Sequence, residues 1–126
     1  MTDVGTFNED STDYPDYARL VGEAVAGGKA ERGILVCGTG IGMSIAANKM
    51  RGVRAAVVWS KETAALAAEH NGANVLCLGG RVHSPSKIIG FARIWLKTPF
   101  GEGRHRRRLN KIAALDRRTV RRGGKP

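Results

Sequence analysis

Residues 33–44 read GILVCGTGIGMS, and this stretch decides the fold. Residues 33–37 form a short, continuous apolar run, which is typical of a parallel β-strand buried on both faces. A glycine-rich turn follows directly, and an alanine-rich helical pattern continues over 43–50. In open α/β sheets, ligands bind where a strand ends and the chain turns toward the next helix. The stretch therefore predicts an α/β fold and places the candidate site at residues 37–44.

The same alternation of apolar runs and helical patterns extends in both directions. Further strands are expected at 53–59 and 74–78, and further helices at 14–26, 60–71 and 85–97. Ser60 is a good N-cap residue, although Thr63 in place of an acidic residue or its amide gives it only part of a capping box. Strands of about five residues that alternate with helices of about ten predict a parallel α/β sheet.

Length and composition set the broad class of the protein. The 126 residues are the length of one domain. No apolar run reaches the roughly 18 residues of a membrane-spanning helix. The acidic start of the chain lacks the apolar segment of a signal peptide. Cys37 and Cys77 are too few for a disulfide framework or a four-cysteine zinc site, so a reduced cytoplasmic setting is expected.

The net charge of +10 is concentrated near the C-terminus. Residues 101–126 hold ten Lys and Arg against two carboxylates, whereas residues 1–100 hold eleven against nine. Apolar residues at helical spacing predict an amphipathic helix over 104–122, and these are Leu109, Ile112, Ala113 and Leu115. The expected organisation is an α/β core over 1–98, a linker and basic helix of the same domain over 99–122, and a disordered tail over 123–126.

The basic segment leaves a second class of function open, a nucleic-acid-binding or scaffolding module. Binding of that kind would fall steeply as the salt concentration rises. Phe100 is the last aromatic residue, so the basic segment offers no aromatic side chains for base stacking. A run of charge alone is weak evidence for a nucleic-acid site, because it is usually a solvated surface.

Cys37 is the first candidate for chemistry, because it stands where the first strand meets the turn. Gly38, Gly40 and Gly42 allow backbone N–H groups to converge on an anion at the start of a helix. The same amides favour the thiolate form of Cys37. The spacing fits neither the dinucleotide fingerprint nor a P-loop. On the pattern alone, the alternative remains that the turn is merely tight and that Cys37 is a buried filler.

Other candidates are weaker when taken singly. Cys77 lies inside an apolar strand and is expected to be a buried, inert thiol. His70 and Asn71 end a helix, where a histidine is suited to work near neutral pH or simply to cap the helix. Arg104 and Arg108 share one helix face, which suits a phosphate group or a solvated surface. His83 and His105 are ambiguous, and the chain holds no metal-binding sequence motif.

Four strings together resemble the ribose-5-phosphate isomerase B family, which includes the galactose-6-phosphate isomerase subunits. They are DYPDYARLVGEAVAGG (13–28), RGILVCGTGIGMSIAANKMRGVRAA (32–56), EHNGANVLCLGGRV (69–82) and GEGRHRRRLNKI (101–112). The likeness runs from about Thr2 to about Asp116. The turn CGTGIG followed by AANK is its most specific part, and it favours a functional Cys37 over a filler.

The resemblance implies a Rossmann-like, three-layer α/β/α sandwich that works as a homodimer or homotetramer with an active site shared between subunits. It implies an aldose–ketose isomerase that interconverts ribose 5-phosphate and ribulose 5-phosphate through an enediolate, without metal or organic cofactor. The alternative within the family is a galactose-6-phosphate isomerase subunit. Such subunits divide their catalytic residues between two chains, so the presence of both Cys37 and His70 favours the self-sufficient isomerase.

The resemblance also implies a role for each site residue. The Cys37 thiolate would move the proton. The oxyanion would be held by the Thr39 hydroxyl and by the backbone amides of the turn, which include Gly38, Gly40, Gly42 and Ser44. His70 would open the sugar ring, beside a sugar contact from Asn71. Tyr14 would line the sugar pocket, and Arg104 and Arg108 would clamp the phosphate group.

One departure from the family concerns the beginning of the sequence. Family members start with a strand, a turn carrying an Asp-His pair, and a helix, and no Asp-His pair occurs in this chain. The resemblance therefore implies that a leading βα unit of on the order of 30 residues is missing. We expect exposed strand edges, lower stability than in the family, and weak or no activity. Ordinary stability in a urea melt together with normal turnover would contradict this expectation.

Overall fold

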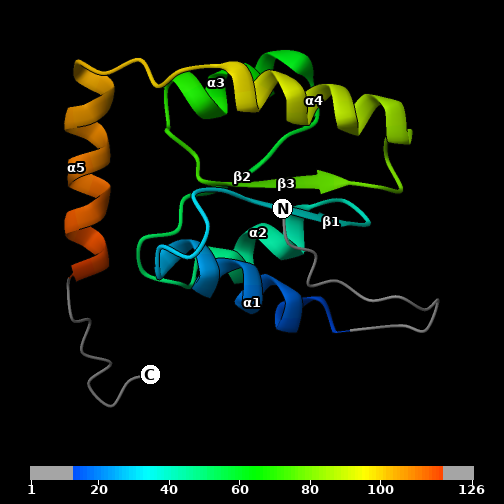
Figure 1. Ribbon diagram of the computed structural model, residues 1–126, viewed down its shortest axis with the longest axis horizontal. Helices are drawn as coiled ribbons and strands as arrows, with labels where there is room; N and C mark the ends of the chain where they lie inside the picture. Colours follow the sequence, from blue (N-terminus) through cyan, green and yellow to red (C-terminus); the bar gives the residue numbers. More distant parts are fainter. Residues whose placement is uncertain (1–12, 118–126) are drawn as a thin grey trace.

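A computed structural model describes residues 13–117, and predictions that fall on 1–12 or 118–126, including the tail over 123–126, lie outside the described residues. Eight elements follow one another along the described chain (Figure 1). They are α1 (Tyr14–Ala26), β1 (Gly33–Cys37), α2 (Ile41–Ala47), β2 (Ala55–Val57), α3 (Lys61–Glu69), β3 (Val75–Gly79), α4 (Pro85–Lys97) and α5 (Arg104–Arg117).

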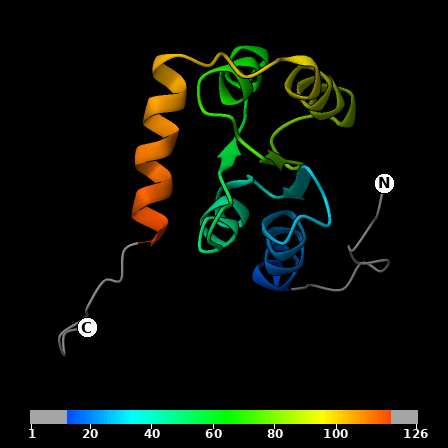
Figure 2. The same ribbon diagram turned by 60° about the vertical axis from the view of Figure 1, so that its left-hand side comes forward.

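The three strands form one parallel sheet in the order β1-β3-β2. β3 lies in the centre, and all five of its residues are buried. Helices α1 and α2 cover one face of the sheet, and α3 and α4 cover the other (Figures 1 and 2). This arrangement confirms the three-layer α/β/α sandwich with a parallel sheet that the sequence predicts. The fifth helix, α5, stands beside the sandwich, next to the amino ends of the strands.

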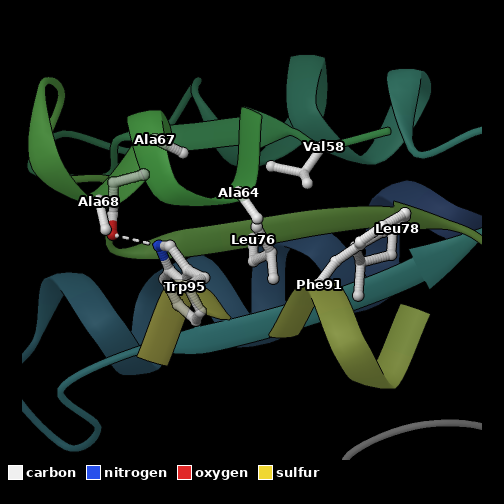
Figure 3. Close-up of a cluster of buried hydrophobic side chains, with 9 residues drawn as sticks. Val58, Ala64, Ala67, Ala68, Leu76, Leu78, Phe91 and Trp95 are labelled. Atoms are coloured by element: carbon white, nitrogen blue, oxygen red, sulfur yellow. Dashed lines mark hydrogen bonds between the residues drawn. The ribbon is translucent and has the colours of Figure 1, made fainter. Parts of the chain in front are cut away.

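Alternate residues of β3 supply two hydrophobic cores, one on each face of the sheet. Leu76 and Leu78 pack with Trp95 and Phe91 of α4 and with the alanines of α3 (Figure 3). Trp95 is fully buried, and its indole N–H donates to the carbonyl oxygen of Ala73 at 3.2 Å, so its polar atom is satisfied. On the other face, Val75 and Cys77 pack against α1 and α2.

The largest differences between expected and observed element boundaries are in β2 and in α2, whereas α3 and β3 differ by one or two residues at their ends. The second strand has three residues, not the seven of 53–59, because a side chain binds the backbone just before it: Asn74 Oδ1 accepts from the Arg54 N–H at 2.7 Å. Helix α2 starts two residues early, at Ile41, since Gly40 turns the chain with a φ of +87°. The capping box of α3 is complete, because the Thr63 hydroxyl accepts from the Ser60 N–H.

The outer edge of β1 is open within residues 13–117, because β3 is the one described strand that pairs with it. Ile34 and Val36 are 43% and 47% exposed, although their register partners Leu76 and Leu78 are buried. An edge strand with unpaired backbone groups and uncovered apolar side chains is a surface on which another segment can pair.

Candidate active site

The turn after β1 brings a backbone amide to the Cys37 sulfur. The Gly40 N–H donates to Cys37 Sγ at 3.2 Å, and the thiol is half-buried. A Cβ at Gly40 would lie 3.1 Å from the Leu78 carbonyl carbon, so the turn packs closely against β3. The turn thus needs glycine at 40 for its positive φ and for its contact with the central strand. The sulfur faces the start of a helix, where an anion is favoured.

One hydroxyl group stands in this turn, on Thr39, and a second follows it on Ser44 of α2. The Thr39 hydroxyl accepts from the Ile41 N–H at 3.1 Å, which leaves its own hydrogen available to donate to a ligand. The side chain of Thr39 is exposed. Ser44 is buried, and its hydroxyl donates to the Ile41 carbonyl oxygen at 2.7 Å. Of the two, Thr39 is therefore the better placed to donate to a bound molecule.

Two side chains from outside the turn lie directly against its glycines. The Tyr14 ring covers Gly42, where an added Cβ would come within 2.6 Å of the ring. Arg81 follows β3 and lies along Gly38, with its Cδ 3.4 Å from the position of an added Cβ. The structure therefore places Tyr14 against the turn that carries Cys37. Sequence reasoning missed Arg81, whose place after the carboxyl end of β3 was the available signal.

Cys77 provides the expected contrast to Cys37. Its side chain is fully buried in β3. Burial, with a smaller contribution from nearby Cys37, raises the pKa of the Cys77 thiol to about 12. A thiol of this kind stays protonated at neutral pH, which confirms the prediction of a buried thiol and disfavours Cys77 as a base.

A second group of predicted residues lies where α3 ends and α5 begins. His70 is the C-cap residue of α3, and its ring stacks on that of His105 with 4.4 Å between centroids. The Nε2 atom of His70 is 3.3 Å from a carboxylate oxygen of Glu69. Leu109 of α5 is buried against Gly72, whose φ is +50°. These contacts fix α5 against the end of α3.

The two arginines of the predicted phosphate clamp, Arg104 and Arg108, belong to this second group of residues. Arg104 and Arg108 are exposed, one turn apart on α5, on either side of His105 in sequence. Within residues 13–117 neither forms an ion pair with a carboxylate, whereas Arg106 pairs with Glu102 at 3.3 Å. Asn71, directly after His70, is exposed as well. The exposed side chains form a cationic surface suited to a phosphate group.

The two groups lie at opposite ends of the sheet within one chain. Cys37 is the last residue of β1, at the carboxyl ends of the parallel strands. His70 precedes β3, and α5 stands at the amino ends of the strands (Figure 1). The five residues of β3 alone span roughly 16 Å between these ends. A single chain therefore does not bring Cys37 together with His70, Arg104 and Arg108.

A cavity of about 510 Å³ opens beside α4 and does not include Cys37. It is lined by Trp59, Lys61, His83, Ser86, Lys87, Gly90 and Phe91. Across residues 13–117, no three His, Cys, Asp or Glu side chains are grouped as they would be around a metal ion. No helix in that part of the chain is long and apolar enough to cross a membrane.

We expect the docking of α5 to weaken as the pH falls below about 6.5, the ordinary pKa of histidine. Desolvation, then His70, Arg104 and Arg108, lower the pKa of His105, while Glu69 opposes them. The folded state therefore disfavours a protonated His105, and this contribution to stability is present above the ordinary pKa and is lost below it. Amide hydrogen exchange in α5, corrected for its intrinsic pH dependence, should rise between pH 8 and pH 5.

The matched variant for this expectation is His105→Gln, which keeps a polar side chain and cannot take up the proton. Its α5 amides should show a flatter dependence on pH than those of the unmodified chain. Equal pH dependence in the two proteins would show that His105 does not control the docking of α5.

Comparison with known proteins settles the family. The Ribose/Galactose Isomerase family model matches residues 1–112. The chain belongs to this family. Ribose-5-phosphate isomerase B of Escherichia coli is 45% identical over 118 residues, which cover 94% of this chain and 79% of that protein. Family membership makes the chain a sugar-phosphate isomerase and confirms the enzyme class predicted from the sequence.

Solved structures agree with the sequence comparison. The type B ribose 5-phosphate isomerase of Trypanosoma brucei has a TM-score of 0.86 at 50% identity, over 89% of this chain and 76% of that one. Ribose-5-phosphate isomerase B of Mycoplasma genitalium, solved with bound ribulose-5-phosphate, has a TM-score of 0.89 at 45% identity, over 93% of this chain and 78% of that one. Likeness at this level of identity confirms the Rossmann-like fold predicted above.

Proposed function

We propose that this chain interconverts ribose 5-phosphate and ribulose 5-phosphate. The observation that carries the proposal is the half-buried Cys37 thiol, which accepts the Gly40 N–H at 3.2 Å at the start of a helix. Such a thiol is placed to work as a thiolate base. Relatives that carry this activity in their names support the choice of substrate.

The reaction moves one proton between the first two carbons of the open-chain sugar. In the aldose-to-ketose direction, the Cys37 thiolate takes the proton from the second carbon, and the carbonyl oxygen becomes the oxyanion of an enediolate. The Thr39 hydroxyl and backbone amides of the turn donate to this oxyanion. The amides of Gly40, Ile41 and Ser44 are not among them, because they already donate to Cys37 Sγ, the Thr39 hydroxyl and the Gly40 carbonyl oxygen. As the new carbonyl forms, the proton of the hydroxyl on the second carbon passes to the oxyanion on the first carbon, and the Cys37 thiol returns its proton to the first carbon itself.

The second group of residues supplies what the Cys37 turn lacks. His70 would transfer the proton that opens the sugar ring, with Asn71 as its neighbour on the sugar. Arg104 and Arg108 would hold the phosphate group as a pair of guanidinium forks. Because one chain holds these residues and Cys37 at opposite ends of its sheet, we infer that the site forms between two copies.

Exposed apolar side chains beside both groups support assembly of this kind. Ile41 and Ile45 of α2, next to the Cys37 turn, are 49% and 59% exposed. Ile112 and Leu115 of α5, beyond the phosphate arginines, are 43% and 60% exposed. Two apolar helix faces, one beside each half of the site, suit contacts between the halves of neighbouring copies. We propose a homodimer, or a homotetramer formed by two such dimers.

We also propose a cytoplasmic location, because the Cys37 thiol works only in its reduced form and the cytoplasm is a reducing compartment.

The experiment is turnover of ribose 5-phosphate, followed as ribulose 5-phosphate, by this chain and by a version extended upstream in its reading frame. Turnover by either protein supports the proposal. Activity of the extended version alone would show that the added residues are necessary for turnover. A parallel assay with galactose 6-phosphate separates the alternative within the family. No turnover of any sugar phosphate by either protein would contradict the proposal.

A further inference from the structure

One peptide group in the Cys37 turn is held at both of its polar atoms. It joins Thr39 to Gly40, and its N–H donates to Cys37 Sγ at 3.2 Å. Its carbonyl oxygen, on Thr39, accepts from the indole N–H of Trp59 at 2.9 Å. The indole and the sulfur therefore lie at opposite ends of a single peptide unit. Because the unit is planar, the hydrogen bond from the indole to its carbonyl oxygen fixes the direction in which its N–H points.

This peptide needs an anchor, because the residue after it is glycine. Gly40 has a φ of +87°, and glycine takes up positive and negative φ about equally readily. Rotation of the peptide would turn the N–H away from Cys37 and direct the Thr39 carbonyl oxygen toward the sulfur. An oxygen there would repel a thiolate, whereas an N–H stabilises it. A hydrogen bond to the carbonyl oxygen also polarises the N–H of the same peptide.

Contacts on its backbone and on its ring hold Trp59 in place. The Trp59 backbone N–H donates to the Thr63 hydroxyl at 3.3 Å, within the capping box of α3. The indole meets the His83 ring edge-on at 5.7 Å, and His83 meets the buried Phe91 of α4 at 5.2 Å. Trp59 itself is 45% exposed, so burial in a core does not fix its ring, and these contacts do.

We propose that Trp59 is a positioning residue for the isomerase reaction. Its indole N–H holds the Thr39–Gly40 peptide so that the Gly40 N–H points at the Cys37 sulfur and favours the thiolate. Trp59 does not touch the reacting atoms and acts through the peptide alone. The consequence for turnover rests on the proposed role of Cys37 as the base, whereas the consequence for thiol reactivity does not.

The test is Trp59→Phe, which keeps an aromatic ring against His83 and removes the N–H. The readout is the rate of Cys37 alkylation by iodoacetamide across pH 6 to 10, with the modified residue assigned by mass spectrometry. We expect alkylation at pH 7 to slow by about three- to tenfold, because the sulfur loses a hydrogen bond that favours the thiolate. In the isomerase assay, kcat should fall by a similar factor while KM stays within about twofold.

Trp95→Phe is the matched control, because Trp95 also donates its indole N–H to a backbone carbonyl oxygen, that of Ala73. Trp95 is fully buried, so its loss should lower the midpoint of a urea melt and leave Cys37 alkylation unchanged. Unchanged alkylation in Trp59→Phe would overturn the proposal, and so would equal slowing in both variants. A third outcome separates the two proposals. If Trp59→Phe slows alkylation but the unmodified protein does not isomerise sugar phosphates, the positioning role of Trp59 is upheld and the proposed function is contradicted.

Discussion

Replacing Cys37 by alanine is expected to abolish isomerisation and to leave the fold intact. General base catalysis contributes roughly 10²- to 10⁴-fold to a rate, and the turn offers no second base at this position. The fold should survive because the Cys37 side chain is half-buried, and within residues 13–117 its sulfur accepts a single hydrogen bond, from the Gly40 N–H at 3.2 Å. The substitution therefore removes the chemistry while removing little packing.

The measurement is exchange of the substrate's second-carbon proton with deuterated solvent, followed by NMR beside turnover. Cys77→Ala is the matched control, since burial raises the pKa of its thiol to about 12 and prevents it from serving as a base at neutral pH. That variant should lose stability through a cavity in the core and keep proton exchange. Exchange at the unmodified rate in Cys37→Ala would assign the base to another residue.

The part of the site that the sequence reveals is the part built from neighbouring residues. The stretch 33–44 contains its strand, its turn and its helix in one run, so their order alone places Cys37 beside Gly40 and a helix start. The positive φ at Gly40 follows from the same run, because a turn this tight requires glycine. The predicted helices 14–26 and 85–97 are confirmed to the residue as α1 and α4, since N-cap residues and prolines mark their starts.

Contacts between distant segments could not be predicted in this way. Trp59 lies 20 residues from Thr39, and nothing in its own neighbourhood indicates that its N–H reaches that carbonyl oxygen. The stacking of His70 on His105 depends on the path of α5, which is set by burial of Leu109 against Gly72. Such contacts arise from the packing of whole elements, and periodicity in one segment carries no information about them.

The separation of the two candidate groups is the structural result with the largest consequence for function. Resemblance to the family assigns roles to Cys37 and His70 without saying where in one chain they lie. Parallel strands fix their positions, because a residue that ends a strand and a residue that precedes one must lie at opposite ends of the sheet. A site that uses both then requires a second copy of the chain.

Mixing two inactive variants is therefore expected to restore activity. One variant is Cys37→Ala, and the other is the double variant Arg104→Gln/Arg108→Gln, whose substitutions fall on exposed positions of α5. Each protein alone should have little turnover, because every site lacks either the base or the phosphate clamp. With both variants made in the version of the chain that turns over ribose 5-phosphate, refolding them together in equal amounts should restore about a quarter of that version's rate. Half of the dimers are then mixed, and each mixed dimer has one complete site of two.

The recovery distinguishes the two possible arrangements of the site, because a mixed dimer behaves differently in each. If Cys37 of one copy works with the arginines of the other, one site of the mixed dimer holds both functional halves and the second holds neither. If both halves belonged to one chain, each site of the mixed dimer would lack one of them, and mixing would restore nothing.

The control is a mixture of Cys37→Ala with Cys37→Ser, in which every site lacks the thiol and refolding together should restore no activity. Recovery in the first mixture and none in the control would establish that the isomerase site is shared between chains, whereas no recovery in either would place the whole site in one chain and contradict the separation seen across the sheet.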